Sequence, residues 1–348
     1  LGNPAGCLCS NNYNVIPVKQ KYQCGNRSMN INWLCVFITS VILATVFSVE
    51  AKQVDYPRDT SYTIHSAYHK YMKNYPQIEV ADPVLDDQIN IQKNITYKFT
   101  GTRDLRLDVF SPKDMGKASP AVVMVHGGGW ISGDRTLIHP MAKALAEIGF
   151  VAATVEYRLS PEAEYPAAVY DIKTAVKWLK DHAVDLQVDT HKVAIMGTSA
   201  GGQLAALVGA TAEDPDFEDP ADSSQASTKV QAIVDIDGVL AFIHPDSQEG
   251  AVAGKWLGGD QNEARKKWIE ASPITHVGAD TPPMLFVGSS YPRFLAGREK
   301  VTAILDEHGI ENRTHLFENA PHSFWLFHPW FEPTIDHTVA FLNEVLTD

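Results

Sequence analysis

Cysteine is absent from all but the start of this chain of 348 residues. The four cysteines are Cys7, Cys9, Cys24 and Cys35. The rest of the chain therefore cannot form a thiolate zinc cluster, a cysteine nucleophile or a disulfide framework. A body without cysteine also suits an oxidising compartment.

Basic side chains are scarce as well. The sequence has 29 Lys and Arg against 42 Asp and Glu, which gives a formal net charge of −13 at pH 7. Such a surface repels phosphate backbones, so nucleic-acid binding is not expected, and strong attraction to an anionic membrane is disfavoured. Hydrophobic residues make up 45% and charged residues 20%, which is typical of a globular protein and excludes a wholly disordered chain.

Long hydrophobic runs are missing except near the N-terminus, where residues 33–47 read WLCVFITSVILATVF without a charge. A run of 15 is short for a membrane-spanning helix, and Val49 and Ala51 follow as the −3 and −1 residues of a signal-peptidase site. The span without charge extends over residues 31–49, however, so an uncleaved membrane anchor is the alternative.

The chain is therefore expected to have three parts. Residues 1–28 are predicted to be a leader or upstream segment, residues 29–51 a secretory signal peptide, and residues 52–348 one folded domain that is secreted or periplasmic. A membrane partner is expected only if the N-terminal segment remains as an anchor.

Residues 52–348 show neither an internal repeat nor a low-complexity tract, and short apolar runs alternate there with amphipathic stretches. The predicted strands are 105–110, 121–125, 151–155, 193–196, 232–236, 284–287 and 314–317. The predicted helices include 140–148, 167–180, 200–210, 297–308 and 334–346. Nearly continuous apolar strands are buried on both faces, so we predict an α/β fold with a mostly parallel sheet and helices on both faces.

Two stretches break this alternation. Residues 211–229 are polar and acidic, which is typical of a solvated loop. Residues 239–272 form a longer insertion that contains Trp256 and Trp268, and they predict a small lid over the site. Since ligands of such sheets bind beyond the C-terminal strand ends, catalytic residues are expected just after the apolar runs.

The strongest chemical signal is a G-x-S-x-G motif at residues 197–201, between a predicted strand and a predicted helix. This is the context of a nucleophile elbow, where a sharp turn presents the serine hydroxyl above the sheet. Ser199 is therefore the predicted nucleophile. The backbone N–H of Ala200, at the start of the helix, is placed to bind an oxyanion.

A second signal is the HGGG segment at residues 126–129, directly after another predicted strand. Successive glycines leave backbone N–H groups uncovered, which suits stabilisation of the negative oxygen in a tetrahedral intermediate. A phosphate-binding loop is the alternative, but no G-K-[ST] follows and the G-x-G-x-x-G spacing is absent.

The general base is predicted to be His322, in the segment APHSF after the last apolar run. Thirteen histidines are present, and His322 is favoured because the order serine, acid, histidine places the base after the last strand. His315 falls within a predicted strand, and His328 lies in an aromatic run.

Four segments together resemble the α/β-hydrolase esterases, in particular the hormone-sensitive-lipase-like branch and its bacterial carbohydrate-esterase relatives. They are residues 126–130, 156–162, 197–202 and 321–324, and the resemblance covers residues 95–345. It implies the α/β-hydrolase fold.

The resemblance also assigns roles to single residues. It implies Ser199 as nucleophile, His322 as base, and the N–H groups of Gly127, Gly128 and Ala200 as the oxyanion hole.

The sequence departs from this family at the acid of the triad. Tyr291 stands where those enzymes commonly have Asp, and no carboxylate occurs in residues 281–298. An imidazole without an anionic partner loses control of its tautomer, so another acid is needed. Asp237 is the predicted replacement because it follows the apolar run 232–236 and preserves the chain order. The remaining candidates are Glu249, Glu318 and Glu332.

Aromatic side chains give the only indication of the substrate. Residues 324–331 read FWLFHPWF and hold five aromatics in eight residues, some of which must be core. Five tryptophans could offer flat surfaces to sugar rings, with packing against the sheet as the alternative: Trp130, Trp256, Trp268, Trp325 and Trp330. Trp130 and Trp325 are the predicted substrate-binding residues. The run 321–331 resembles that of secreted bacterial esterases that deacetylate plant polysaccharides, including pectin and xylan.

These features predict a secreted serine esterase that hydrolyses carboxylic esters of plant polysaccharides, acetyl esters in particular. The reaction is expected to pass through an acyl-enzyme and to need neither a metal nor an organic cofactor. A general short-chain carboxylesterase or lipase-like enzyme is the closest alternative. Because the acid departs from the family pattern, a catalytically weak binding protein on a hydrolase scaffold is the second alternative.

Overall fold

The computed structural model describes residue 59, residues 61–82 and residues 84–346. The predicted leader (1–28) and signal peptide (29–51) lie outside these residues, so both stay predictions. Among the helices of the described residues, none has the length and apolar character needed to cross a membrane.

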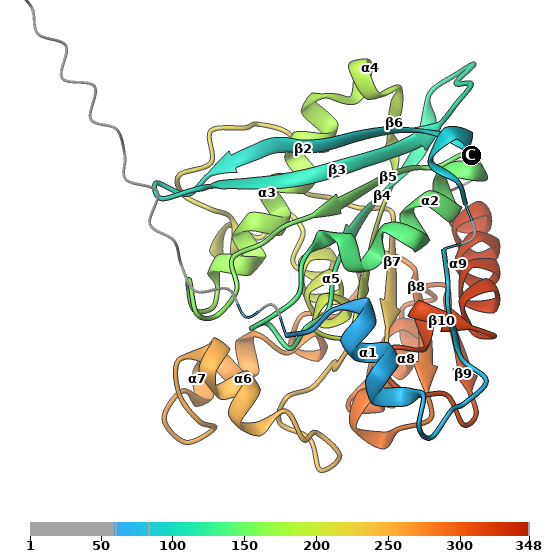
Figure 1. The fold of residues 1–348 in the computed structure, drawn as a ribbon. Helices are drawn as coiled ribbons and strands as arrows, with labels where there is room; N and C mark the ends of the chain where they lie inside the picture. The colour runs from blue at the N-terminus through green and yellow to red at the C-terminus, as the bar shows by residue number, and fades with distance from the viewer. Residues whose placement is uncertain (1–58, 60, 83, 347–348) are drawn as a thin grey trace, which may run out of the picture. The chain divides into compact units, whose positions relative to one another are not determined.

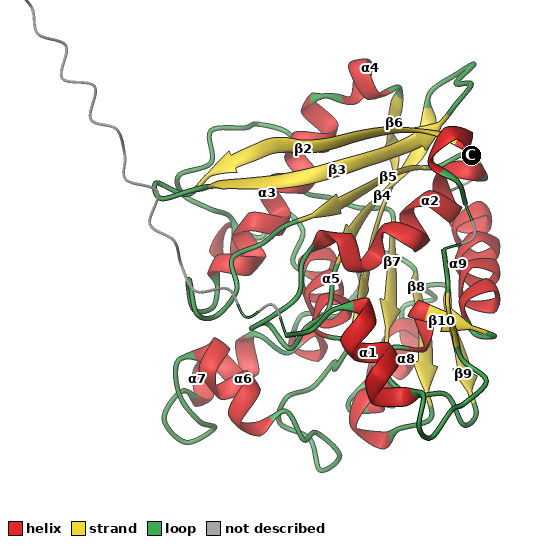
Figure 2. Ribbon diagram, viewed as in Figure 1, coloured by secondary structure: helices red, strands yellow, loops and turns green. Residues whose placement is uncertain are grey.

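Eight strands of the described residues form one central sheet in the order β2-β3-β5-β4-β6-β7-β8-β9 (Figures 1 and 2). Their bounds are β2 Ile89–Phe99, β3 Asp104–Pro112, β4 Ser119–Val125, β5 Val151–Val155, β6 Val188–Thr198, β7 Ala232–Ile236, β8 Met284–Ser289 and β9 Asn312–Phe317. The strand β3 is antiparallel to both of its neighbours, and all other neighbours run parallel. The predicted mostly parallel sheet is confirmed.

Helices cover both faces of this sheet, as predicted (Figure 1). One face packs against α3 (Ala167–Asp181), α5 (Ala200–Ala210) and α8 (Arg298–Glu307). The other face packs against α2 (His139–Glu147), α9 (Phe331–Val345) and α1 (Ile64–Tyr71).

The strand β4 shows why two separate cores arise. Its side chains alternate between them, with Val123 and Val125 in the first core and Val122 and Met124 in the second. Successive side chains of a strand point to opposite faces, so an uninterrupted apolar run supplies both layers.

Some elements were not predicted because their sequence signal is weak. The edge strand β2 is only partly buried and carries several polar residues, so it lacks the apolar run that identified its neighbours. The short strands β1 (Glu79–Val80) and β10 (Phe327–His328) pair with each other in a separate two-stranded sheet. The short helix α4 (Ala183–Leu186) precedes β6.

The insertion after β7 folds into two short helices, α6 (Gly250–Leu257) and α7 (Arg265–Glu270). Trp256 and Trp268 are both buried there, and the Trp256 ring stacks on Trp130 with 5.1 Å between centroids. These tryptophans fix the insertion to the core, so they offer no free surface for a sugar ring.

Candidate active site

The sequence-predicted site residues all follow strands that end at the same edge of the sheet. Gly127–Gly129 follow β4, Ser199 follows β6, Asp237 follows β7 and His322 follows β9. These four strands run parallel, so their C-terminal ends bring together residues that lie far apart in the sequence.

Ser199 sits on a sharp turn between β6 and α5. Its φ of 55° and ψ of −122° are a strained conformation for a residue with a side chain. A Cβ on Gly197 would lie 1.9 Å from the Gly201 carbonyl oxygen, and one on Gly201 would lie 2.2 Å from the Val125 carbonyl oxygen. The two glycines of the motif are therefore required for the strand and the helix to approach this closely.

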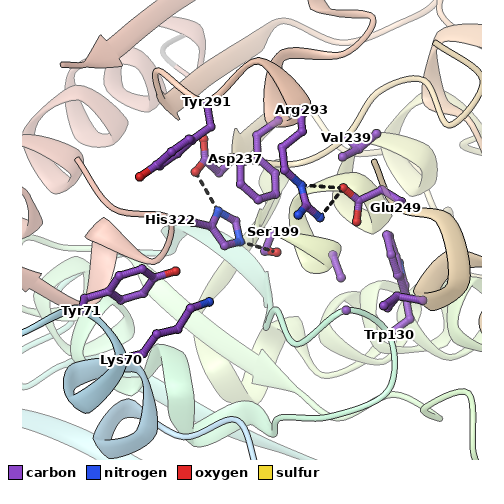
Figure 3. A pocket seen from close by; sticks show the side chains of 14 residues that line it. Lys70, Tyr71, Trp130, Ser199, Asp237, Val239, Glu249, Tyr291, Arg293 and His322 are labelled. Carbon is purple, nitrogen blue, oxygen red and sulfur yellow. Dashed lines mark hydrogen bonds and ion pairs between the residues drawn. The ribbon is translucent and has the colours of Figure 1, made fainter. Parts of the chain in front are cut away.

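The His322 ring bridges Ser199 and Asp237 (Figure 3). Its Nε2 lies 2.8 Å from Ser199 Oγ, and its Nδ1 lies 2.8 Å from Asp237 Oδ2. The ring stacks on Phe294 with centroids 3.7 Å apart, and the edge of Trp325 meets it at 5.1 Å. Packing on two sides holds the imidazole in the plane that joins the hydroxyl to the carboxylate.

Asp237 is the carboxylate that the structure brings to the base. Its side chain is 0% exposed. It accepts hydrogen bonds from the backbone N–H of Ser289 to Oδ1 at 2.7 Å and from the Ser289 hydroxyl to Oδ2 at 2.6 Å. The end of β8 thus supplies donors to an acid carried on β7. The carboxylate is oriented by these bonds and can fix the tautomer of His322.

The other carboxylates considered from the sequence lie elsewhere. Glu249 is paired with Arg293, Glu332 accepts a hydrogen bond from His328, and Glu318 is exposed. Tyr291, at the position where the resemblance expects an acid, is 43% exposed. Of these four side chains, none is bonded to the His322 ring within the described residues.

Gly127 lets the glycine loop lie directly against the nucleophile. A Cβ on Gly127 would lie 2.7 Å from the carbonyl oxygen of Thr198 and 3.0 Å from the Cβ of Ser199. Any larger residue would push the loop away from the elbow. The structure therefore gives Gly127 a packing role, which the sequence analysis did not foresee.

Gly129 was missed as a site residue. It lines the cavity with Ser199 and Ala200, whereas Gly127 and Gly128 do not. Three consecutive glycines could not show which of them faces the cavity, because that depends on the course of the loop. The N–H groups of Gly127, Gly128 and Ala200 stay predicted oxyanion donors, and Gly129 joins them as a candidate.

A cavity of about 440 Å³ opens over the hydrogen-bonded residues. Figure 3 shows the side chains that line it. Trp130 is among them, although it is buried and its Nε1–H donates to Gln203 Oε1 at 2.9 Å. Trp325 is only 1% exposed and does not line the cavity, so the prediction that it binds substrate is wrong. It packs behind the base instead.

Among the described residues, no group of three or more His, Cys, Asp or Glu side chains is arranged to hold a metal ion. The chemistry available at the site therefore comes from a hydroxyl, an imidazole, a carboxylate and backbone N–H groups. This set can carry out nucleophilic attack, proton transfer and stabilisation of an oxyanion.

A family model described as BD-FAE matches residues 107–293, which is more than half of the chain. The chain belongs to the BD-FAE family. The matched BD-FAE region holds the glycine loop, Ser199 and Asp237, whereas His322 lies C-terminal to it.

The BD-FAE chain is also similar to curated proteins of Mycobacterium tuberculosis. LipM is 33% identical over 177 residues, which cover 49% of this chain and 40% of LipM. Esterase LipQ is 28% identical over 237 residues, which cover 64% of this chain and 55% of LipQ. The chain thus spans about half the length of the curated relatives it matches.

Solved structures share the fold of this BD-FAE member. Thermogutta terrifontis esterase 2 is 26% identical, and the match covers 76% of this chain and 97% of that one with a TM-score of 0.62. A carbohydrate esterase from gut microbiota is 22% identical, with 76% and 99% covered and a TM-score of 0.62. The fold is that of the α/β-hydrolases, as the motifs implied.

Proposed function

We propose that this protein is a serine carboxylic ester hydrolase that acts on short acyl esters, above all acetyl esters of carbohydrates. The observation that supports this proposal is the hydrogen-bonded chain from Asp237 through His322 to Ser199 at the wall of a cavity. The esterases LipQ and LipC and Thermogutta terrifontis esterase 2 are similar proteins with this activity in their names.

The geometry supports a two-step reaction. Ser199 Oγ attacks the ester carbonyl carbon while its proton passes to His322 Nε2, and Asp237 stabilises the imidazolium that forms. Backbone N–H groups of the glycine loop and of Ala200 receive the oxyanion. The C–O bond to the alcohol then breaks, the alcohol leaves with the proton from His322, and an acyl-Ser199 remains.

Water completes the cycle. His322 accepts a proton from a water molecule as its oxygen attacks the acyl carbon, and a second oxyanion forms in the same place. When this intermediate collapses, Ser199 Oγ leaves, regains a proton from His322, and the carboxylic acid is released. No group outside the chain and the substrates is needed to balance the atoms or the charge.

The walls of the cavity favour a short acyl group. The larger apolar side chains that line it together with Gly129 and Ala200 are Trp130, Val239, Val252 and Phe294. Val252 limits the space most directly, because its Cγ1 lies 3.1 Å from the place of a Cβ on Gly129. An acyl group bound over the oxyanion donors therefore meets a wall after few carbons.

The ligands and names of similar proteins support a short acyl group. Thermogutta terrifontis esterase 2 has been solved with butyrate and with propionate bound. The versiconal hemiacetal acetate esterase of Dothistroma septosporum is 25% identical over 254 residues. A general short-chain carboxylesterase is equally consistent with these comparisons, so the carbohydrate portion and secretion from the cell remain parts of the proposal.

An organophosphate tests the nucleophile. Thermogutta terrifontis esterase 2 is phosphorylated by paraoxon. We expect paraoxon to place one diethylphosphoryl group on Ser199, as located by peptide mass spectrometry, and to abolish hydrolysis of p-nitrophenyl acetate. Ser199→Ala should lose this label and at least about 10⁴-fold in kcat. Ser227→Ala, on the acidic loop, serves as the matched control and should keep both.

The acyl preference is tested with a series of p-nitrophenyl esters. The proposal expects kcat/KM to be highest for acetate and to fall steadily toward the eight-carbon ester. Faster turnover of the eight-carbon ester would contradict the acetyl preference and favour the lipase-like alternative. Labelling at a residue other than Ser199 would contradict the proposed mechanism itself.

A further inference from the structure

The cavity over Ser199 carries accessible positive charge, although the chain as a whole has a formal net charge of −13. Two cationic side chains line it, Lys70 from α1 and Arg293 from the turn Pro292–Leu295. Two carboxylates line it as well, Asp237 and Glu249. Which sign a substrate meets depends on how far each of these four groups is exposed.

Both carboxylates are already bonded to other groups of the protein. Asp237 is fully buried and is already bonded to His322 and to Ser289. The Glu249 side chain is 7% exposed, and its Oε1 accepts hydrogen bonds from Nε and Nη2 of Arg293 at 3.1 and 2.7 Å. Neither carboxylate therefore presents a free negative charge to a bound molecule.

The cations remain accessible. Lys70 is exposed, and its ammonium lies 4.9 Å from the centroid of the Tyr71 ring. Within the described residues no carboxylate pairs with it. Figure 3 shows its side chain reaching from α1 toward Ser199 and His322. The Arg293 side chain is 37% exposed, and its two bonds to Glu249 do not use Nη1.

Figure 3 shows Lys70 and Tyr71 on the α1 side of Ser199, whereas the ion pair of Arg293 and Glu249 lies toward Trp130. Trp130 and Val252 bound the side of the glycine loop, where the proposed reaction would place the acyl group. Lys70 and Tyr71 bound the side of α1 (Figure 3). Burial raises the pKa of Tyr71 to about 12, so its phenol stays protonated at neutral pH and can donate a hydrogen bond. The α1 side therefore receives the alcohol portion of the ester.

We propose that Lys70 binds a carboxylate on the alcohol portion of the substrate, so that the preferred substrates are acetyl esters of acidic sugars such as uronic acids. This inference rests on the proposed esterase function and specifies its substrate class. An ammonium without a carboxylate partner at the wall of the cavity attracts an anion without first breaking an ion pair. The phenol of Tyr71 adds a donor for the carboxylate or a neighbouring hydroxyl.

A pair of substrates tests the charge preference. Acetate release from mono-O-acetylated galacturonic acid and mono-O-acetylated galactose is measured under identical conditions. The expected preference in kcat/KM for the acidic sugar is at least about fivefold at low ionic strength, and it shrinks when salt is raised to about 0.5 M, where exposed charges are screened. A preference for the neutral sugar would overturn the proposal.

The variant Lys70→Met removes the charge and keeps the length of the side chain. It should reduce the acidic-to-neutral ratio of kcat/KM to about 1, and the ratio divides out any general loss of activity. Lys73→Met is the matched control, because Lys73 is an exposed lysine just beyond the end of α1 that does not line the cavity. It should keep the ratio of the wild type. An unchanged ratio in Lys70→Met would overturn the assignment.

A third substrate distinguishes the two portions of the ester. The hemisuccinate ester of galactose carries its carboxylate on the acyl side. If the protein prefers this ester to acetylated galacturonic acid, the carboxylate site lies on the acyl side and the proposal is wrong. If p-nitrophenyl acetate is turned over but no acidic ester is preferred, only this inference fails. If no ester is hydrolysed, the proposed function fails and this inference fails with it.

Discussion

Asp237, the acid of the hydrogen-bonded triad, has an unusual backbone conformation. Its φ of 52° turns the chain sharply after β7, and its N–H donates to the Val287 carbonyl oxygen at 2.9 Å. Asp tolerates this conformation better than most residues do. The turn aims the carboxylate toward β8, where Ser289 holds both of its oxygens. A serine at the end of β8 thus orients an acid that β8 itself does not carry.

The variant Asp237→Asn tests this residue. An amide at this place presents an N–H to His322 Nδ1 and favours the wrong tautomer, which costs about 10⁴ in kcat in a well-studied serine protease. We expect a loss of about 10³ to 10⁴ in kcat for p-nitrophenyl acetate. Asp235→Asn, two residues earlier, is the matched control and should keep most of the activity. Equal losses in the two variants would contradict the assignment of the acid.

The buried carboxyl of Asp235 is expected to make the stability of the protein depend on pH. Burial raises the pKa of this carboxyl well above the ordinary value of 3.8, the nearby charge of Asp237 raises it further, and the Gly238 N–H and Arg298 act in the opposite direction. Asp235 of the unfolded chain ionises near pH 4, whereas the folded protein retains the proton. Folding therefore binds a proton in this range, and the free energy of unfolding falls as the pH rises.

Asparagine cannot ionise, so Asp235→Asn removes this decrease in the free energy of unfolding. Above about pH 4 the variant should be more stable than the wild type, and the difference should grow until the pH reaches the pKa of Asp235 in the folded protein. The total difference in the free energy of unfolding is about 1.4 kcal/mol for each unit by which folding raises this pKa. Thermal or urea unfolding between about pH 4 and pH 8 measures it. Parallel pH profiles for the two proteins would show that Asp235 is ionised in the folded state.

At the scale of elements, the insertion after β7 shapes the acyl side of the cavity. Helix α6 places Val252 against Gly129, and Trp256 of the same helix stacks on Trp130. The stack joins α6 to the residue that follows the glycine loop. Because of this contact, the lid contributes a fixed wall to the site, and a change in α6 is expected to alter specificity.

The variant Val252→Ala should enlarge the space on the acyl side of the cavity. One carbon in a hydrophobic pocket changes discrimination by roughly 1–3 kcal/mol, so we expect the ratio of kcat/KM for butyrate over acetate esters to rise at least about fivefold. Val184→Ala, on α4, is the matched control because Val184 is 90% exposed and does not line the cavity. A ratio that stays constant in Val252→Ala would place the acyl group elsewhere.

At the scale of the whole molecule, a buried network of charges joins the sheet edge to the helical layer. Asp171 on α3 is fully buried and receives Arg158, which follows β5, through both of its oxygens at 2.8 Å. Lys98 of β2 lies 2.8 Å from Asp171 and 2.7 Å from Asp219 on the acidic loop. Four segments that are distant in the sequence are thus held by one carboxylate and its partners.

Removing the charge of Asp171 should leave Arg158 without its carboxylate partner and Lys98 with Asp219 alone. Breaking a buried ion pair in this way costs about 3–5 kcal/mol, so Asp171→Asn should lower the free energy of unfolding by that amount in urea denaturation. Asp181→Asn, at the exposed end of the same helix, is the control and should change it by less than about 1 kcal/mol. A small effect at Asp171 would mean that the network contributes little to stability.

The sequence predicted much of the fold because its signals are local. The apolar run 151–155 and the amphipathic stretch 200–210 coincide with β5 and α5. The edge strand β2 was missed because a strand with one covered face and many polar residues lacks such a run. The aromatic run around Trp325 was misread for a related reason, since an aromatic sequence does not show which rings are buried.

The sequence by itself determined the residues whose signal lies within one turn or loop: the nucleophile elbow at Ser199, the glycine loop, and the histidine after the last strand. Only the tertiary structure decided that Asp237 meets His322, 85 residues away, and that Gly129 and Lys70 face the same cavity. The physical reason is that a local backbone pattern is recorded in neighbouring residues, whereas the partner of a side chain depends on which strand ends the folded sheet brings together.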